Sequence, residues 1–216
     1  AARTAAAPNV GAANFAVGKT FGTEYFDGRL DDTAIYDTTI SANQARSLGT
    51  GHTQADNLET AYPLVALYRF ENAAQIGRDD SDVRSHLTAY GDQVNQDAIG
   101  RYGSAVRLGG SDDWLGMAGD TGGDFGGLPS GVPFGKSSYT IAAWIKPDAD
   151  AVSNAGIVGW GNYGANTQTN AFRLDPAGLM NYWWYDDITA PEAGFPGFNL
   201  KDGAWHHVIA MYDQAT

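Results

Sequence analysis

The sequence predicts an all-β protein, built as a two-sheet antiparallel β-sandwich with one short helix. Short segments rich in β-branched and aromatic residues recur along the chain, and glycine-rich turns separate them. The 28 glycines and 8 prolines favour tight turns over long helices. With 216 residues the chain can bury the core of one large sandwich, so we expect a single domain over residues 1–216.

Nine segments have the composition expected of strands, and their number and spacing are typical of a sandwich. In 139–144, YTIAAW, and in 206–211, HHVIAM, apolar residues fill both faces, which predicts central strands. The nine expected strands are 14–17, 28–36, 64–70, 105–108, 139–146, 156–160, 171–175, 180–185 and 205–212.

One segment carries a helix signal. Ser41 and Gln44 form a capping-box pattern ahead of Leu48, and Gly49 marks the expected end of the helix after about two turns. The stretch that follows, 50–63, is polar and weakly patterned and ends in proline. It is therefore interpreted as a linker.

Charge and residue usage exclude several classes of partner and cofactor. The net charge is −12, from 21 Asp and 4 Glu against 13 Lys and Arg, so we expect no nucleic-acid partner. Because no cysteine is present, disulfides and thiolate metal sites are excluded. No apolar run approaches the ~20 residues of a membrane span. Aspartate suits turns, and it also suits calcium, which prefers oxygen ligands.

Several motifs together point to a known family. They are FDGRLDD at 26–32 running into AIY at 34–36, IS at 40–41, LYRFE at 67–71, GSAVRL at 103–108, YTIAAWIKP at 139–147 and WHHVIA at 205–210. With these motifs the chain resembles the laminin-G-like, concanavalin A-like lectin/glucanase superfamily. The resemblance implies a jelly-roll form of the β-sandwich.

The motifs stand in a rotated order relative to that family, whose domains run from the LYRFE-like strand to the DGRLDD strand and the helix. Here 1–49 correspond to the C-terminal strands and helix, 50–63 to a linker, and 64–216 to the N-terminal and central strands. A hairpin strand expected after the WHH strand is missing. A circular permutation, a window from tandem copies, or a strand supplied by a neighbour would each explain this order. The last would leave an open sheet edge for self-assembly.

The resemblance also implies structural calcium. The first and last strands of a jelly roll are neighbours, so the acidic group ending DGRLDD and the RDDSD loop at 78–82 would converge. Asp31 is the most direct ligand, followed by Asp79 and the carbonyl groups around Glu71. The alternative is that Asp31 only caps a turn.

The YWWYDD segment at 182–187 is the candidate sugar-binding element. Alternate residues of a strand point to opposite faces, so one aromatic pair would enter the core and the other would be exposed beside two carboxylates. Flat aromatic rings stack on sugars and carboxylates accept hydroxyl hydrogen bonds. Core packing alone is the alternative. The candidate residues are Trp160, Tyr163, Trp183, Trp184, Asp186 and Asp187.

No catalytic motif stands out. Retaining glycosidases of this superfamily use two glutamates a few residues apart on one strand. The four glutamates here, Glu24, Glu59, Glu71 and Glu192, are far apart in sequence. No Gly-x-Ser-x-Gly elbow is present, and the adjacent His206 and His207 would point to opposite faces.

Two functions follow as expectations. The first is a non-catalytic carbohydrate-binding or adhesion module that holds structural calcium, with a glycan or polysaccharide as partner. The second is a structural building block of an extracellular filament or surface layer, assembled by strand exchange. Both place the protein outside the cell or on its surface.

Overall fold

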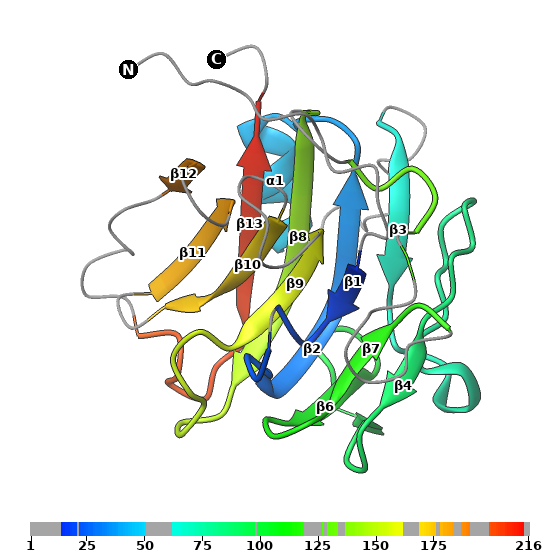
Figure 1. The fold of residues 1–216 in the computed structure, drawn as a ribbon, viewed down its shortest axis with the longest axis vertical. Coiled ribbons are helices and arrows are strands. Elements are labelled where there is room, and N and C mark those ends of the chain that lie inside the picture. The colour runs from blue at the N-terminus through cyan, green and yellow to red at the C-terminus, as the bar shows by residue number, and fades with distance from the viewer. Residues whose placement is uncertain are drawn as a thin grey trace.

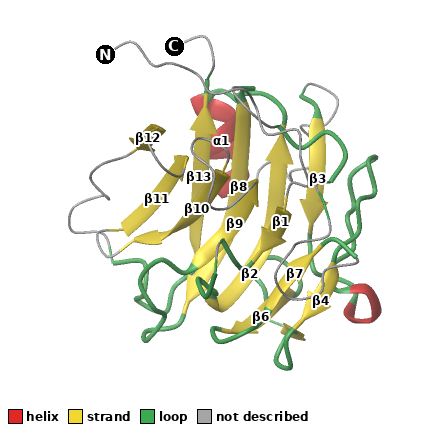
Figure 2. Cartoon of the chain, in the orientation of Figure 1, coloured by secondary structure: helices red, strands yellow, loops and turns green. Residues whose placement is uncertain are grey.

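The computed structural model describes 14–20, 22–50, 62–97, 99–118, 127, 129–133, 137–161, 169–175, 178–183, 187–190 and 199–213. Two antiparallel sheets confirm the expected all-β sandwich, as Figures 1 and 2 show. One sheet has the order β12 (Asp187–Ala190), β11 (Gly178–Trp183), β10 (Thr169–Asp175), β9 (Gly156–Gly161), β1 (Asn14–Val17), β7 (Trp114–Gly116) and β4 (Thr88–Tyr90). The other has the order β13 (His206–Tyr212), β8 (Tyr139–Pro147), β2 (Asp27–Tyr36), β6 (Ala105–Gly109) and β5 (Asn95–Asp97), and β3 (Leu64–Tyr68) also pairs with β2.

The first fifty residues supply inner strands of both sheets. β1 lies between β9 and β7, and β2 lies between β8 on one edge and both β6 and β3 on the other. Strand pairing does not show how the segment order arose, so the single permuted domain over 1–216 stays a prediction.

The main core lies between the two sheets. Phe15 and Phe172 come from one sheet and Leu30 and Ile141 from the other, and all four are almost fully buried. Each such side chain contributes roughly 1.5–3 kcal/mol on burial. Because β1 and β2 carry two of these four residues, the N-terminal strands are part of the same core.

The helix α1 (Ala42–Thr50) covers the outer face of the second sheet, behind β8 and β13 in Figure 1. Its Leu48 packs with Tyr36 in a second apolar cluster. The capping box is present: Gln44 Oε1 accepts the Ser41 N–H at 2.7 Å, and Ser41 Oγ accepts the Gln44 N–H at 3.3 Å.

Two expectations about element positions differ from the structure. The helix runs through Gly49 to Thr50, and a Cβ on Gly49 would lie 2.8 Å from His207 Nδ1. This glycine therefore permits close approach to β13 instead of ending the helix. β13, expected to be a central strand, stands at the end of its sheet order among the described strands, where it pairs with β8.

A 3-10 turn, η2 (Ala73–Gln75), follows β3. In the part of the chain that the structure describes, no helix has the length and apolar character needed to cross a membrane. Most of the predicted linker, 51–61, lies outside the described residues.

Candidate functional site

The central feature is a junction on one edge of β2, where β6 ends and β3 takes over. β6 pairs with Asp27–Leu30 and β3 with Thr33–Tyr36, and the register with β8 shifts between Asp31 and Ala34. We call Asp31, Phe70, Glu71 and residues 100–104 the strand junction. Phe70 (φ +60°) and the neighbouring Asp32 (φ +41°) have backbone conformations that non-glycine residues rarely adopt.

Asp31 binds the loop that precedes β6. Its Oδ2 accepts the N–H groups of Arg101 at 2.7 Å and Tyr102 at 2.9 Å, and its Oδ1 accepts the N–H of Asp32 at 2.8 Å. The residue is fully buried. Burial raises the pKa of Asp31 to about 7, and the charge of Asp32 adds to this rise while the N–H donors oppose it. This geometry is a turn cap, made by a carboxyl group that is costly to ionise.

Glu71 binds the other end of the same loop. Both of its carboxylate oxygens lie 3.2 Å from the Ser104 nitrogen, whose N–H they share. Gly103 has φ +59°, and a Cβ there would lie 2.1 Å from Glu71 Oε1. An alanine there would have a strained backbone and would displace the end of the Glu71 side chain, so glycine suits the close approach of the loop, and the structure brings Asp31 and Glu71 to one loop.

Asp79 anchors a different loop. Its Oδ1 accepts N–H groups of Leu67 and Ser81, both at 2.9 Å, and its Oδ2 accepts that of Ser85 at 2.8 Å. The residue also bridges Tyr68 through the backbone. Asp79 thus holds the 79–85 loop against β3, whereas Asp31 and Glu71 hold the 100–104 loop.

Aromatic and basic groups cover the outer side of Asp31. Trp144 lies opposite Asp31 on β8, and the Arg101 guanidinium stands over its ring at 4.6 Å. Tyr102 meets the same ring edge-on at 6.0 Å, and His207 lies 5.0 Å from it. Burial lowers the pKa of His207 to about 4, so this histidine is neutral near pH 7.

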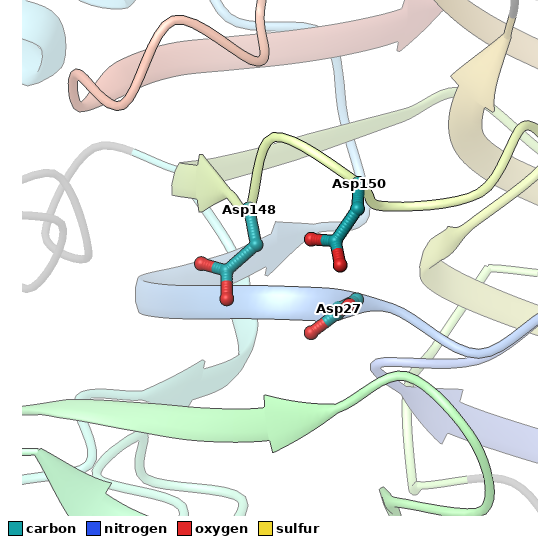
Figure 3. A group of neighbouring side chains, drawn as sticks. All are labelled: Asp27, Asp148 and Asp150. Carbon is teal, nitrogen blue, oxygen red and sulfur yellow. The ribbon is translucent and has the colours of Figure 1, made fainter.

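Two clusters of carboxylates have the spacing of a metal site among the described residues, and neither contains Asp31, Asp79 or Glu71. In the first, shown in Figure 3, Asp27 from β2 faces Asp148 and Asp150 from the turn after β8, with ligand atoms within 4.8 Å of one another. The Arg107 guanidinium bridges Asp27 Oδ1 at 3.1 Å and Asp148 Oδ2 at 2.8 Å, which already offsets part of their charge.

The second group consists of Asp92, Asp112 and Asp113. Asp113 is buried and accepts the N–H groups of Gln93 at 3.0 Å and Gly109 at 2.6 Å. Sequence reasoning did not find either group, because their members come from separate segments. The local signals were the Asp148 and Asp150 pair directly after a strand and the adjacent Asp112 and Asp113.

The candidate sugar-binding residues fall in three situations. Trp160 is buried in the core, where its ring lies 6.4 Å from Phe15 and 5.5 Å from Tyr139, a position that suits packing. Trp183 and Asp187 are direct cross-strand partners in the β11–β12 hairpin. The other three candidates, Tyr163, Trp184 and Asp186, lie outside the described residues.

Residues 120–216 match the laminin G family model of the concanavalin A-like lectin/glucanases superfamily. The expected family resemblance is confirmed. The laminin-G-like match spans β8 to β13 and includes the Trp183–Asp187 hairpin. No curated protein and no solved structure matches the chain.

Proposed function

We propose that this protein is a non-catalytic, extracellular carbohydrate-binding or adhesion module that holds structural calcium. The observation that supports it is the pairing of Trp183 with Asp187 inside the laminin-G-like region. An aromatic ring can stack on the C–H face of a sugar while a neighbouring carboxylate accepts its hydroxyl groups. Laminin-G-like domains are commonly extracellular, which agrees with this role.

Glycan arrays and affinity gels test sugar binding. We expect weak, calcium-sensitive retention that Trp183→Ala and Trp184→Ala each reduce by about tenfold. Loss of one aromatic ring costs ~1–3 kcal/mol where nucleic-acid bases stack on such rings, and we expect a stacked sugar to lose an amount at the lower end of this range. Trp205→Ala is the matched control, since this half-buried tryptophan lies outside the hairpin. Equal retention of all variants, or no retention of the wild type by any glycan, would contradict the proposal.

The non-catalytic assignment is supported by the two described glutamates. The Glu24 carboxylate is engaged by Arg173 and Thr20, and the Glu71 carboxylate by the Ser104 N–H. They belong to different parts of the sandwich and do not form the close pair that retaining hydrolysis needs. Laminin-G-like domains are typically non-catalytic. Release of reducing ends from β-glucans by the purified protein would contradict the assignment.

For the calcium ion we propose the strand junction as the site, with Asp31 and Glu71 as its ligands. Both carboxyl groups lie at one loop, and no ion pair joins Asp31 to any residue that the structure describes. Calcium prefers oxygen ligands, and when bound it would favour the ionised form of Asp31. Asp79 stays a predicted ligand, with its carboxylate committed to the neighbouring loop.

Thermal unfolding with calcium and with chelator tests this site. A bound cation stabilises by mass action, by ~2.7 kcal/mol at one hundred times the dissociation constant. We expect the calcium effect in the wild type to disappear in Asp31→Asn and Glu71→Gln and to persist in Asp150→Asn. Loss in Asp150→Asn alone would place the ion at the Asp27 group, and no calcium effect in the wild type would remove calcium from the proposal.

A specific observation also favours the structural building block. β13 has seven residues and stands at the end of its sheet order, and its Met211 is 47% exposed. The strand carries neither lysine nor proline, the residues that commonly block edge pairing. Light scattering and electron microscopy should then show concentration-dependent assembly without sugar, which Met211→Lys weakens. A monodisperse wild-type monomer at high concentration would contradict this second function.

A further inference from the structure

A hollow of about 520 Å³ lies beside the strand junction and shares Phe70 and Glu71 with it. It is bounded by the chain that leaves β3, by the 3-10 turn η2, and by β5. Its volume lies in the ~300–1,000 Å³ range of small-molecule sites. The polar side chains that line it are Glu71, Asn72, Gln75, Arg78, Asp80 and Gln96.

Internal contacts fix several of these groups and leave further hydrogen-bonding atoms available. Gln96 Nε2 donates to the Phe70 carbonyl at 2.7 Å, which leaves its Oε1 as an acceptor. Asn72 Oδ1 accepts the Ala74 N–H at 3.0 Å, which leaves its Nδ2 as a donor. Arg78 Nε lies 2.8 Å from one carboxylate oxygen of Asp80. The outer guanidinium nitrogens of Arg78 and the second carboxylate oxygen of Asp80 therefore remain available to hydrogen-bond a ligand.

This inventory selects the class of ligand. Without a cation bound at Glu71, two carboxylates against one guanidinium give the hollow a formal charge of −1, which disfavours phosphate and sulfate. Six of its nine lining residues have polar or charged side chains and the other three are Phe70, Ala73 and Ala74, so many hydrogen-bonding groups surround a ligand. Each hydroxyl group of a sugar both donates and accepts, so a polyhydroxylated ligand matches the interleaved donors and acceptors.

We propose that the hollow binds one sugar residue of a glycan through its hydroxyl groups, as a subsite separate from the Trp183–Asp187 hairpin. The inference rests on the proposed carbohydrate-binding function and adds a second contact point to it. The left-handed backbone at Phe70 (φ +60°) and the hydrogen bond from Gln96 to its carbonyl hold the chain in the shape that opens the hollow.

Amide NMR with a panel of methyl glycosides of glucose, galactose, mannose and N-acetylglucosamine tests the subsite. We expect one of them to shift the resonances of 71–80 and the Gln96 side chain. Gln75→Ala and Arg78→Ala should each weaken that binding about tenfold, because each removes hydrogen-bonding atoms from the lining of the hollow. Ala74→Trp, at an exposed position, should block binding by filling the hollow. Arg46→Ala, on the exposed side of α1, is the matched control and should bind as the wild type does.

The outcomes separate this inference from the proposed function. Glycoside shifts confined to the β11–β12 hairpin, together with a glycan-array signal that Trp184→Ala removes, overturn the hollow and leave the function intact. Silence in both experiments overturns both. If sulfate shifts the same resonances more strongly than any glycoside, the hollow is an anion site and the inference is wrong. Unchanged melting temperatures of the Gln75, Arg78 and Ala74 variants show that their effects are local.

Discussion

At the scale of single residues, two buried titratable groups act in opposite directions on stability. The folded protein raises the pKa of Asp31 from 3.8 to about 7, so its contribution is present below pH 4 and is lost as the pH rises to 7. It lowers the pKa of His207 from 6.5 to about 4, so that contribution is present above pH 6.5 and is lost as the pH falls to 4. The two effects oppose one another between pH 4 and pH 6.5.

In Asp31→Asn only the His207 effect on stability should remain, so the difference between the wild type and this variant reports the effect of Asp31. Without calcium, we expect the free energy of unfolding of the wild type, relative to Asp31→Asn, to fall between pH 4 and pH 7, by at most ~1.4 kcal/mol per pH unit. Denaturant titrations over this range measure it. Parallel pH profiles for both proteins would show that the Asp31 carboxyl group ionises normally in the folded state.

Replacement of His207 by phenylalanine should give the complementary profile while keeping a ring against Trp144. Relative to this variant, the wild type should lose stability as the pH falls from 6.5 to 4, because protonation then favours the unfolded chain. The same titrations check this, with His206→Phe as the control. A wild type that gains stability on acidification relative to the variant would contradict the assignment of a buried neutral His207.

At the scale of elements, contacts between residues close in sequence could be predicted, whereas contacts between distant segments could not. The capping box of α1 could be predicted, because Ser41 and Gln44 are three residues apart and act locally. The hydrogen bonds of Asp31 to Arg101 and Tyr102 could not, because they join groups about 70 residues apart in sequence. The role of Gly103 beside Glu71 is equally hidden, since it depends on two loops that only the fold brings together.

Gly103→Ala should destabilise the protein more than Gly203→Ala. Both glycines have positive φ, which costs an alanine roughly 1–2 kcal/mol, but only the Cβ at Gly103 meets another group, Glu71 Oε1 at 2.1 Å. Thermal unfolding measures the difference. Glu71→Ala in the Gly103→Ala background should recover part of the loss. Equal costs at the two glycines would mean that the loop and Glu71 are not in contact.

At the scale of the whole molecule, residue patterning predicted the sandwich and most of its long strands. It placed the WHH strand centrally because both of its faces look apolar, yet β13 alternates, with Val208 and Ala210 buried and Met211 exposed. The positions of β1 and β2 inside the two sheets are set by pairing over long sequence distances. Such partners cannot be read from local composition.

We predict that the first fifty residues and the rest of the chain unfold together as one cooperative unit. Native-state amide hydrogen exchange tests it on the intact protein, because residues that open only on global unfolding share one free energy of exchange. We expect the amides of Leu30 and Ile35 in β2 to exchange with the same free energy as those of Ile141 and Ala143 in β8. Exchange of β1 and β2 at a clearly lower free energy, while β8 and β9 stay protected, would contradict the claim.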